Sequence, residues 1–201
     1  QKGRYREFVQ CDFDTIGTRS VVADIETALV IHDLLVALGC EAFKIHINNR
    51  KILTGLLSSL GIENKTVPIL RCLDKLSKVS REKVAEEMLA IDGIGKKAVT
   101  SLLAFTEIKG TSEAVLKEAR DLVTDNTTFS SGIGELSELI HGLAVAGVPD
   151  SKVHLDLSIA RGLDYYTGNI FETFLDALPE IGSVCSGGRY DHLAETYTKT
   201  E

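Results

Sequence analysis

A run of purely helical sequence interrupts a chain that otherwise mixes strands and helices. Residues 63–127 show only helical periodicity, with turn signals at 92–93, 110–111 and 125–126. Apolar residues alternate at every second position, as in a strand, both before this run and after it. This order predicts an α/β protein of the α+β type. A helical subdomain, residues 63–128, is inserted between the two parts of a sheet-containing domain, residues 1–62 and 129–201.

The predicted elements follow from periodicity and from helix-ending glycines. Gly39 and Gly61 each follow an amphipathic run, as a glycine after a helix C-terminus does. The pattern predicts strands over 4–14, 43–47, 153–158, 163–175 and 182–185. It predicts helices over 21–38, 50–60, 66–77, 80–90, 95–107, 112–123 and 134–146, with a further helix start near Tyr190.

Charge and composition exclude several classes of protein. The formal charge of −7 argues against nucleic-acid binding through overall basicity, although residues 62–128 taken alone are neutral. No apolar run approaches the roughly 18 residues of a membrane span, and no secretory signal is visible. We therefore expect a cytoplasmic protein that does not enter a membrane. The four cysteines stand singly and the five histidines lack metal-ligand spacing, so no bound metal is expected.

The strand predicted over residues 4–14 has one strongly polar face. Guanidinium groups bind phosphate oxygens in pairs and stay charged at any relevant pH, so this face suits a nucleotide phosphate or an RNA end. The alternative is a solvated strand face with surface ion pairs. The polar residues of this face are Arg4, Arg6, Gln10, Asp12 and Asp14.

Two further stretches place polar and planar groups beside glycines. Residues 160–168 carry Arg161 and adjacent tyrosines between two glycines, where the backbone can approach a ligand closely. Residues 186–191 place Gly187 and Gly188 before a predicted helix start, which would present backbone N–H groups to a polar ligand. The alternatives are a tight turn with core tyrosines and an ordinary loop.

The three stretches together resemble the histidyl-tRNA synthetases. GRYREFVQCDFDTIG (3–17) looks like the second half of motif 2 of this class II family, and ARGLDYYTGNIFE (160–172) looks like its histidine-specific signature. GSVCSGGRYDHL (182–193) is similar to its glycine-rich segment. The resemblance implies part of a class II antiparallel sheet, flanked by helices and interrupted by the helical insertion.

The resemblance also implies a role for each matching residue. Arg161 is expected to contact the ATP α-phosphate and the substrate carboxylate as the catalytic residue, Arg4 the ATP phosphates, and Arg6 either ATP or the tRNA acceptor end. His192 stands where glycine is usual in the family. Residues expected to bind histidine are Gln10, Asp14, Tyr165, Tyr166, Gly187, Gly188 and Tyr190.

The implied activity joins histidine to its tRNA. Enzymes of this family form histidyl-adenylate from histidine and ATP and then transfer histidine to tRNA(His). ATP binds as its complex with Mg²⁺. A homodimer is expected for the parent enzyme. Motif 1, the first half of motif 2, motif 3 and the anticodon-binding domain have no match in these residues, so we expect a fragment that is inactive by itself.

Two alternatives remain open. Residues 91–98 resemble the turn of a helix-hairpin-helix module, in which Lys96 and Lys97 would face a nucleic-acid phosphate, for example on tRNA. A plain turn with solvated lysines is the simpler interpretation. The other alternative is a non-catalytic synthetase-like regulatory protein, which need not keep the arginine and pocket residues found here.

Overall fold

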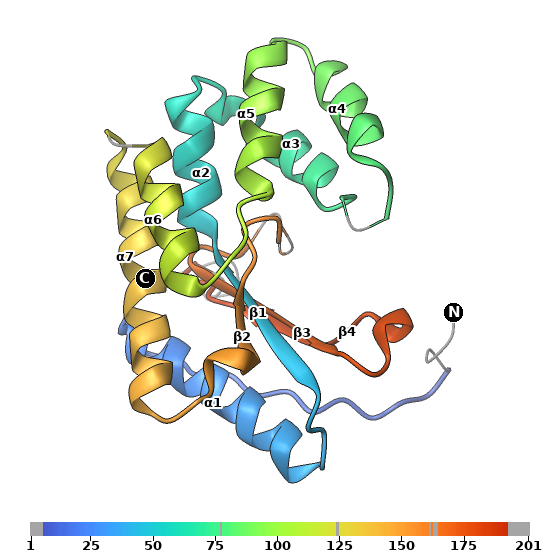
Figure 1. Ribbon diagram of the computed structural model, residues 1–201, viewed down its shortest axis with the longest axis vertical. Coiled ribbons are helices and arrows are strands. Elements are labelled where there is room, and N and C mark those ends of the chain that lie inside the picture. The colour runs from blue at the N-terminus through green and yellow to red at the C-terminus, as the bar shows by residue number, and fades with distance from the viewer. Residues whose placement is uncertain (1–5, 77, 124, 161, 163–164, 193–201) are drawn as a thin grey trace.

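A four-stranded sheet lies at the centre of the computed structural model, which describes residues 6–192 except 77, 124, 161 and 163–164 (Figure 1). The strands follow the order β2-β1-β3-β4. β1 pairs with β3, and β3 with β4, in antiparallel ladders, whereas β1 and β2 are parallel. The parallel pair departs from the expected antiparallel sheet because the chain crosses over through the intervening helices before β2 begins. The strands span Phe43–Asn49 (β1), Val153–Leu155 (β2), Asn169–Leu175 (β3) and Ser183–Gly188 (β4).

The alternation in β1 separates two faces of the sheet. Phe43, Ile45 and Ile47 are fully buried in the hydrophobic core, whereas Lys44 is exposed and His46 half-buried on the other face. Helix α7 packs against β1, β3, α1 and α2, so it joins the sheet to the helical part of the molecule.

The helices follow the predicted pattern, and five of them begin at a side-chain cap. Ser20, Asn49, Ser80, Thr111 and Asn126 each accept a hydrogen bond from a backbone N–H in the first helical turn. The helices span Val21–Ala37 (α1), Arg50–Ser59 (α2), Thr66–Leu73 (α3), Arg81–Leu89 (α4), Lys96–Thr106 (α5), Ser112–Leu122 (α6) and Thr127–Val145 (α7). Short 3₁₀ turns span Glu63–Lys65, Asp150–Lys152 and Pro179–Ile181.

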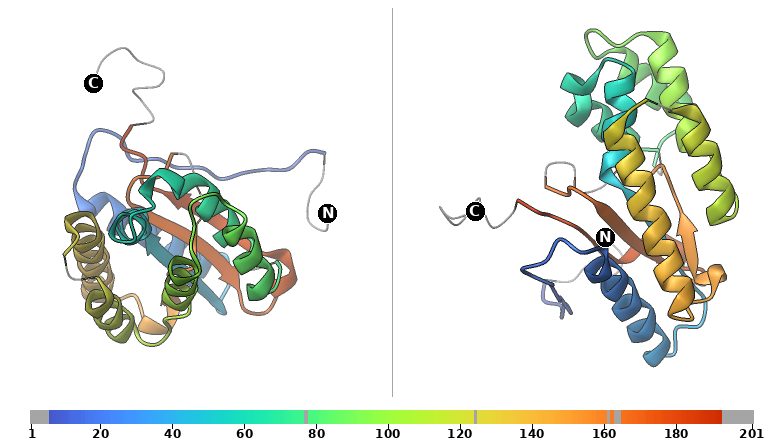
Figure 2. Two further views of the ribbon diagram at one scale, coloured as in Figure 1. Left: turned by 90° about the horizontal axis from the view of Figure 1, so that it is seen from above. Right: turned by 90° about the vertical axis from the view of Figure 1, so that its left-hand side faces the viewer.

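Helices α3, α4 and α5 occupy one end of the molecule. Figure 2 shows α3, α4 and α5 at that end and α1 at the other, with the sheet between them. Helix α6 packs back against α7 and β2. Helix α7 begins at Thr127 and not near Gly134, because the Asn126 cap satisfies the Phe129 N–H at the start of a longer helix.

The strand predicted over residues 4–14 is wrong for the part that the structure describes. Residues 6–20 form neither helix nor strand and lie exposed, with Val9 98% and Ile16 87% exposed. An alternating sequence becomes a strand only where a neighbouring strand takes its hydrogen bonds, and none of the described strands pairs with this segment.

The glycine pair also differs from expectation. Gly187 and Gly188 lie inside β4, opposite Phe171 and Ile170 of β3, and not in a loop before a helix. Both residues pair with β3, and because β4 is the outer strand of the described sheet, alternate backbone N–H groups along it face away from the ladder. Within the described residues no helix begins at Tyr190, and residues 191–192 form a turn.

Close packing of α2 on α7 depends on Gly55, which generates a testable prediction. A Cβ at Gly55 would lie 2.5 Å from the Phe129 nitrogen, whereas a Cβ at Gly134, on the exposed side of α7, would meet nothing within 4 Å. We expect Gly55→Ala to lower the free energy of unfolding by about 1–3 kcal/mol. Gly134→Ala should raise it by up to about 1 kcal/mol, because alanine favours a helix. Urea unfolding measures both; equal effects would contradict the packing.

Candidate functional site

A hydrogen bond joins the opening of the chain to the segment after β4. The Tyr190 hydroxyl donates to Asp14 Oδ1 over 2.5 Å, although the two residues are 176 positions apart. This hydrogen bond to the carboxylate, with smaller contributions from burial and from the charge of Asp14, raises the pKa of the Tyr190 phenol. The contact brings together two of the residues expected to bind histidine.

Tyr165 and Tyr166 lie beside this pair. Their ring centroids are 4.4 Å apart, with the rings edge to face. Burial is the main cause that raises the pKa of Tyr166; a hydrogen bond with Tyr165 and electrostatic interactions with the nearby Tyr165, Tyr190 and Asp14 side chains add to it. The four side chains therefore form one polar aromatic cluster, which we call the tyrosine cluster: Asp14, Tyr165, Tyr166 and Tyr190.

Glycines make room for the Tyr166 ring. A Cβ at Gly162, where the backbone φ is +67°, would collide with that ring, and a Cβ at Gly188 would lie 2.9 Å from its Cδ1. Gly187 has open space around it, as a position next to a ligand requires. These glycines let the ring lie directly against the backbone of β4.

The exposed opening segment passes close to β4. Burial raises the pKa of the Cys185 thiol, and Cys11 and Asp12 raise it further, so these residues are neighbours. Arg6 and Gln10 are exposed, and no contact among the described residues joins them to the tyrosine cluster. Arg4 and Arg161 lie outside the described residues, so the structure does not place the expected ATP contacts.

Arg189 ties the same two parts of the chain together. Its Nε donates to Asp191 Oδ1 over 2.8 Å, and its Nη1 lies 3.4 Å from Asp24 Oδ2 on α1. The guanidinium also reaches the backbone carbonyls of Thr18 and Ser20. Arg189 therefore fixes the end of β4 against the start of α1.

Buried amides continue this network under the sheet. Asn169 donates to Asp24 over 2.9 Å, and Asn49 donates to Asn169 and to Glu135 over 2.8 Å each. Burial raises the pKa of Asp24, although Asn169 and Arg189 partly offset it. The network borders a cavity of about 280 Å³ lined by Arg19, Val21, Asp24, Lys51, Glu135, Arg189, Asp191 and His192.

Sequence analysis assigned no role to the members of this network. The available signal was a polar residue at a position where periodicity favours an apolar one: Asp24 on the buried side of a helix, Asn49 at the end of β1 and Asn169 at the start of β3. Polar groups at such positions are buried only when they are hydrogen-bonded to one another.

The segment predicted to resemble a helix-hairpin-helix turn joins two helices. Helices α4 and α5 flank a turn in which Gly93 has a φ of +83°, and Gly95 starts α5 without a side-chain cap. Lys96 and Lys97 are exposed at this helix start. Their contact with tRNA stays a prediction.

Comparison with known proteins identifies the family. The sequence matches the family model described as histidyl-tRNA synthetase over residues 1–201. The chain belongs to the histidyl-tRNA synthetase family. It is 55% identical over 199 residues to histidine–tRNA ligase of Rhodopirellula baltica and 44% identical over 200 residues to that of Clostridium tetani. These matches cover 99% and 98% of this chain but 45% of each relative, so the chain spans about half of their length.

Solved structures confirm the fold class. The histidyl-tRNA synthetase of Nostoc has a TM-score of 0.85 and 36% identity, over 92% of this chain and 43% of that one. A Bacillus halodurans protein described as an ATP phosphoribosyltransferase regulatory subunit/histidyl-tRNA synthetase has a TM-score of 0.77 and 25% identity, over 90% and 46%. The mixed sheet flanked by helices is thus a class II synthetase fold. Among the described helices, none is long and apolar enough to cross a membrane.

Loss of Arg189 should destabilise the protein more than loss of an exposed arginine. Arg189→Met leaves Asp24 buried without its cation, so we expect the free energy of unfolding to fall by about 3 kcal/mol. Arg81→Met, which removes an exposed ion pair with Glu107, should cost at most about 1 kcal/mol. Chemical denaturation compares the two variants; similar losses would contradict a structural role of the Arg189 network.

Proposed function

We propose that these residues form part of the catalytic region of a histidine–tRNA ligase. The enzyme forms histidyl-adenylate from histidine and ATP and transfers histidine to tRNA(His). The family supports this reaction class. The observation that carries the assignment to a site is the Tyr190–Asp14 hydrogen bond, which joins two motifs expected to share a histidine pocket.

The tyrosine cluster has groups that complement histidine. An ionised Asp14 accepts hydrogen bonds only, which suits an imidazole N–H or the α-ammonium group, while the tyrosine hydroxyls both donate and accept. Gly187 leaves space for the ligand beside the backbone, and Gly188 lets the Tyr166 ring lie against β4. A pocket built from hydrogen-bonding groups rejects an amino acid that leaves them unpaired, by roughly 10⁴-fold or more. Gln10 belongs to the same proposed pocket.

The proposed ATP contacts come from arginines. Arg4 and Arg6 would hold the phosphates of the Mg²⁺–ATP complex, and Arg161 would stabilise the charge that develops on the α-phosphate as the histidine carboxylate attacks. A guanidinium keeps its charge throughout the reaction and takes part in no proton transfer. Arg6 is also proposed to contact the tRNA acceptor end, and the parent enzyme is proposed to act as a homodimer.

Asp14→Asn and Tyr190→Phe test the pocket in the full-length protein that carries these residues. A hydrogen bond to a charged group contributes about 1.5–3 kcal/mol, so each variant should raise the KM for histidine about tenfold or more. Histidine-dependent ATP–pyrophosphate exchange gives this KM and the KM for ATP, which should change little.

The exposed α6 variant Asp121→Asn is the matched control and should leave both constants unchanged. An unaltered KM for histidine in both test variants would refute the pocket.

The same assay tests the chain of 201 residues alone. We propose that this chain is inactive, because the opening segment that carries Asp14 lacks a strand partner among the described residues. Measurable ATP–pyrophosphate exchange by this chain would refute the proposed inactivity.

A salt titration tests whether Lys96 and Lys97 contact tRNA. Each lost phosphate contact lowers the slope of log affinity against log salt by about 0.7–0.9. We therefore expect Lys96→Ala/Lys97→Ala to reduce the slope for tRNA(His) by about 1.5, whereas Lys117→Ala on α6 should leave it unchanged. An unchanged slope in the double variant would refute the tRNA contact and show that both lysines are solvated residues of a plain turn.

A further inference from the structure

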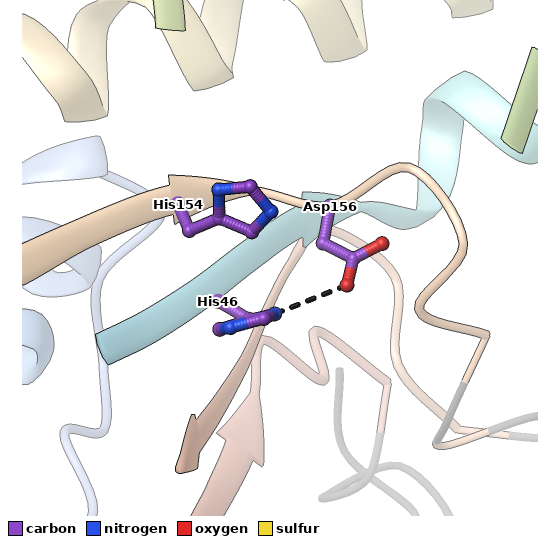
Figure 3. Close-up of side chains that lie close together, drawn as sticks. All are labelled: His46, His154 and Asp156. Atoms are coloured by element: carbon purple, nitrogen blue, oxygen red, sulfur yellow. Dashed lines mark hydrogen bonds and ion pairs between the residues drawn. The ribbon is translucent and has the colours of Figure 1, made fainter. Parts of the chain in front are cut away.

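Two histidines and an aspartate from distant parts of the sequence meet at the edge of the sheet. His46 on β1 and His154 on β2 are direct partners in the parallel ladder, and Asp156 follows two positions after His154. Figure 3 shows the three side chains gathered at one place, with a hydrogen bond of 3.0 Å between His46 Nδ1 and Asp156 Oδ2. None of the three takes part in the tyrosine cluster or in the Arg189 network.

The ligand atoms of these residues are close enough for one ion. One nitrogen from each histidine and one carboxylate oxygen all lie within 4.8 Å of one another. The corresponding atoms of a tetrahedral zinc site are about 3.3 Å apart, as bond lengths of about 2.0 Å require. A side-chain rotation that closes up to about 1.5 Å would complete the site, and zinc would displace the proton that His46 Nδ1 and Asp156 Oδ2 share in their hydrogen bond.

The backbone holds the three residues in place. β1 pairs with β2 on one side and β3 on the other, and the Asp156 N–H donates to the Ile47 carbonyl over 3.0 Å. The Asp156 Oδ1 atom accepts from the N–H and hydroxyl of Ser158, which orients the carboxylate and leaves Oδ2 directed toward His46. Hydrogen bonding behind a ligand in this way is what metal sites use to fix their donors.

The proposed site is accessible to an ion from solvent. His46 and Asp156 are each about one-fifth exposed, so an ion can enter and keep water as a further ligand.

The geometry points to a zinc-binding site formed by His46, His154 and Asp156. Imidazole nitrogens with one carboxylate oxygen suit Zn²⁺ better than Mg²⁺ or Ca²⁺, which prefer oxygen ligands throughout. The ion would clamp the three-residue β2 to β1. The clamp would also hold the turn at Asp156–Ile159, from which residue 160 leads into the histidine-specific signature. Its role is structural, and it is independent of the reaction proposed above.

Zinc titration of the metal-free chain of 201 residues, kept reduced, tests this site directly. Competition with a chromophoric chelator should give one bound Zn²⁺ per chain, and Co²⁺ should give the visible absorption of a four-coordinate nitrogen and oxygen site. His154→Gln removes one ligand. Since loss of an outer-shell partner already costs 10–100-fold in affinity, loss of a ligand should cost at least about tenfold.

His141→Gln is the matched control, because His141 is exposed on α7 and should bind zinc as the unaltered chain does. Zinc should raise the unfolding temperature of the chain and of this control by at least about 3 °C, and that of His154→Gln by less. His46→Gln provides a second test if His154→Gln fails to fold. Absence of zinc binding, or equal affinity in the chain and the ligand variants, would overturn the proposal, since the thiols are present in all of them.

Discussion

The positions of the other two described strands depend on the antiparallel ladder between β1 and β3. It pairs all seven residues of each strand, from Phe43 with Leu175 to Asn49 with Asn169. β2 joins the sheet only through β1, and β4 only through β3. The tyrosine cluster extends from the β4 side of this ladder, and the His46–His154–Asp156 site lies on its β2 side. The two sites therefore lie on opposite sides of one ladder, so the proposed zinc site and the proposed histidine pocket can be tested separately.

Sequence periodicity predicted most of this fold. The helices and the strands β1 and β3 were identified because apolar spacing and capping residues act locally, within a few positions of one another. The strand predicted over residues 4–14 does not form in the part that the structure describes, because a strand needs a partner and residues 6–14 have none among the described strands. The glycine pair was placed in a loop because Gly187 and Gly188 carry no side chain that reports on their neighbours in β3.

The candidate site shows the same limit. The motifs indicated Asp14, Tyr166 and Tyr190, and the structure brings them together, whereas the roles of Arg4 and Arg161 stay predictions. The Arg189 network and the His46–Asp156 pair were missed, since their partners are up to 171 and 110 positions apart. Metal-ligand spacing in a sequence reveals only ligands that lie on the same helix or strand. His46 and His154 lie on β1 and β2, which become neighbours only because the chain crosses over between them.

The Asn49–Asn169 pair has a consequence for the order in which the chain folds. These partners are 120 positions apart, so closing the ladder from an unfolded chain orders a very long loop. Helices α3 to α6 lie within that loop, and their hydrogen bonds are local. If these helices fold first, they shorten the effective length of the loop that must close before β1 pairs with β3. The insertion then accelerates the assembly of the sheet that it interrupts.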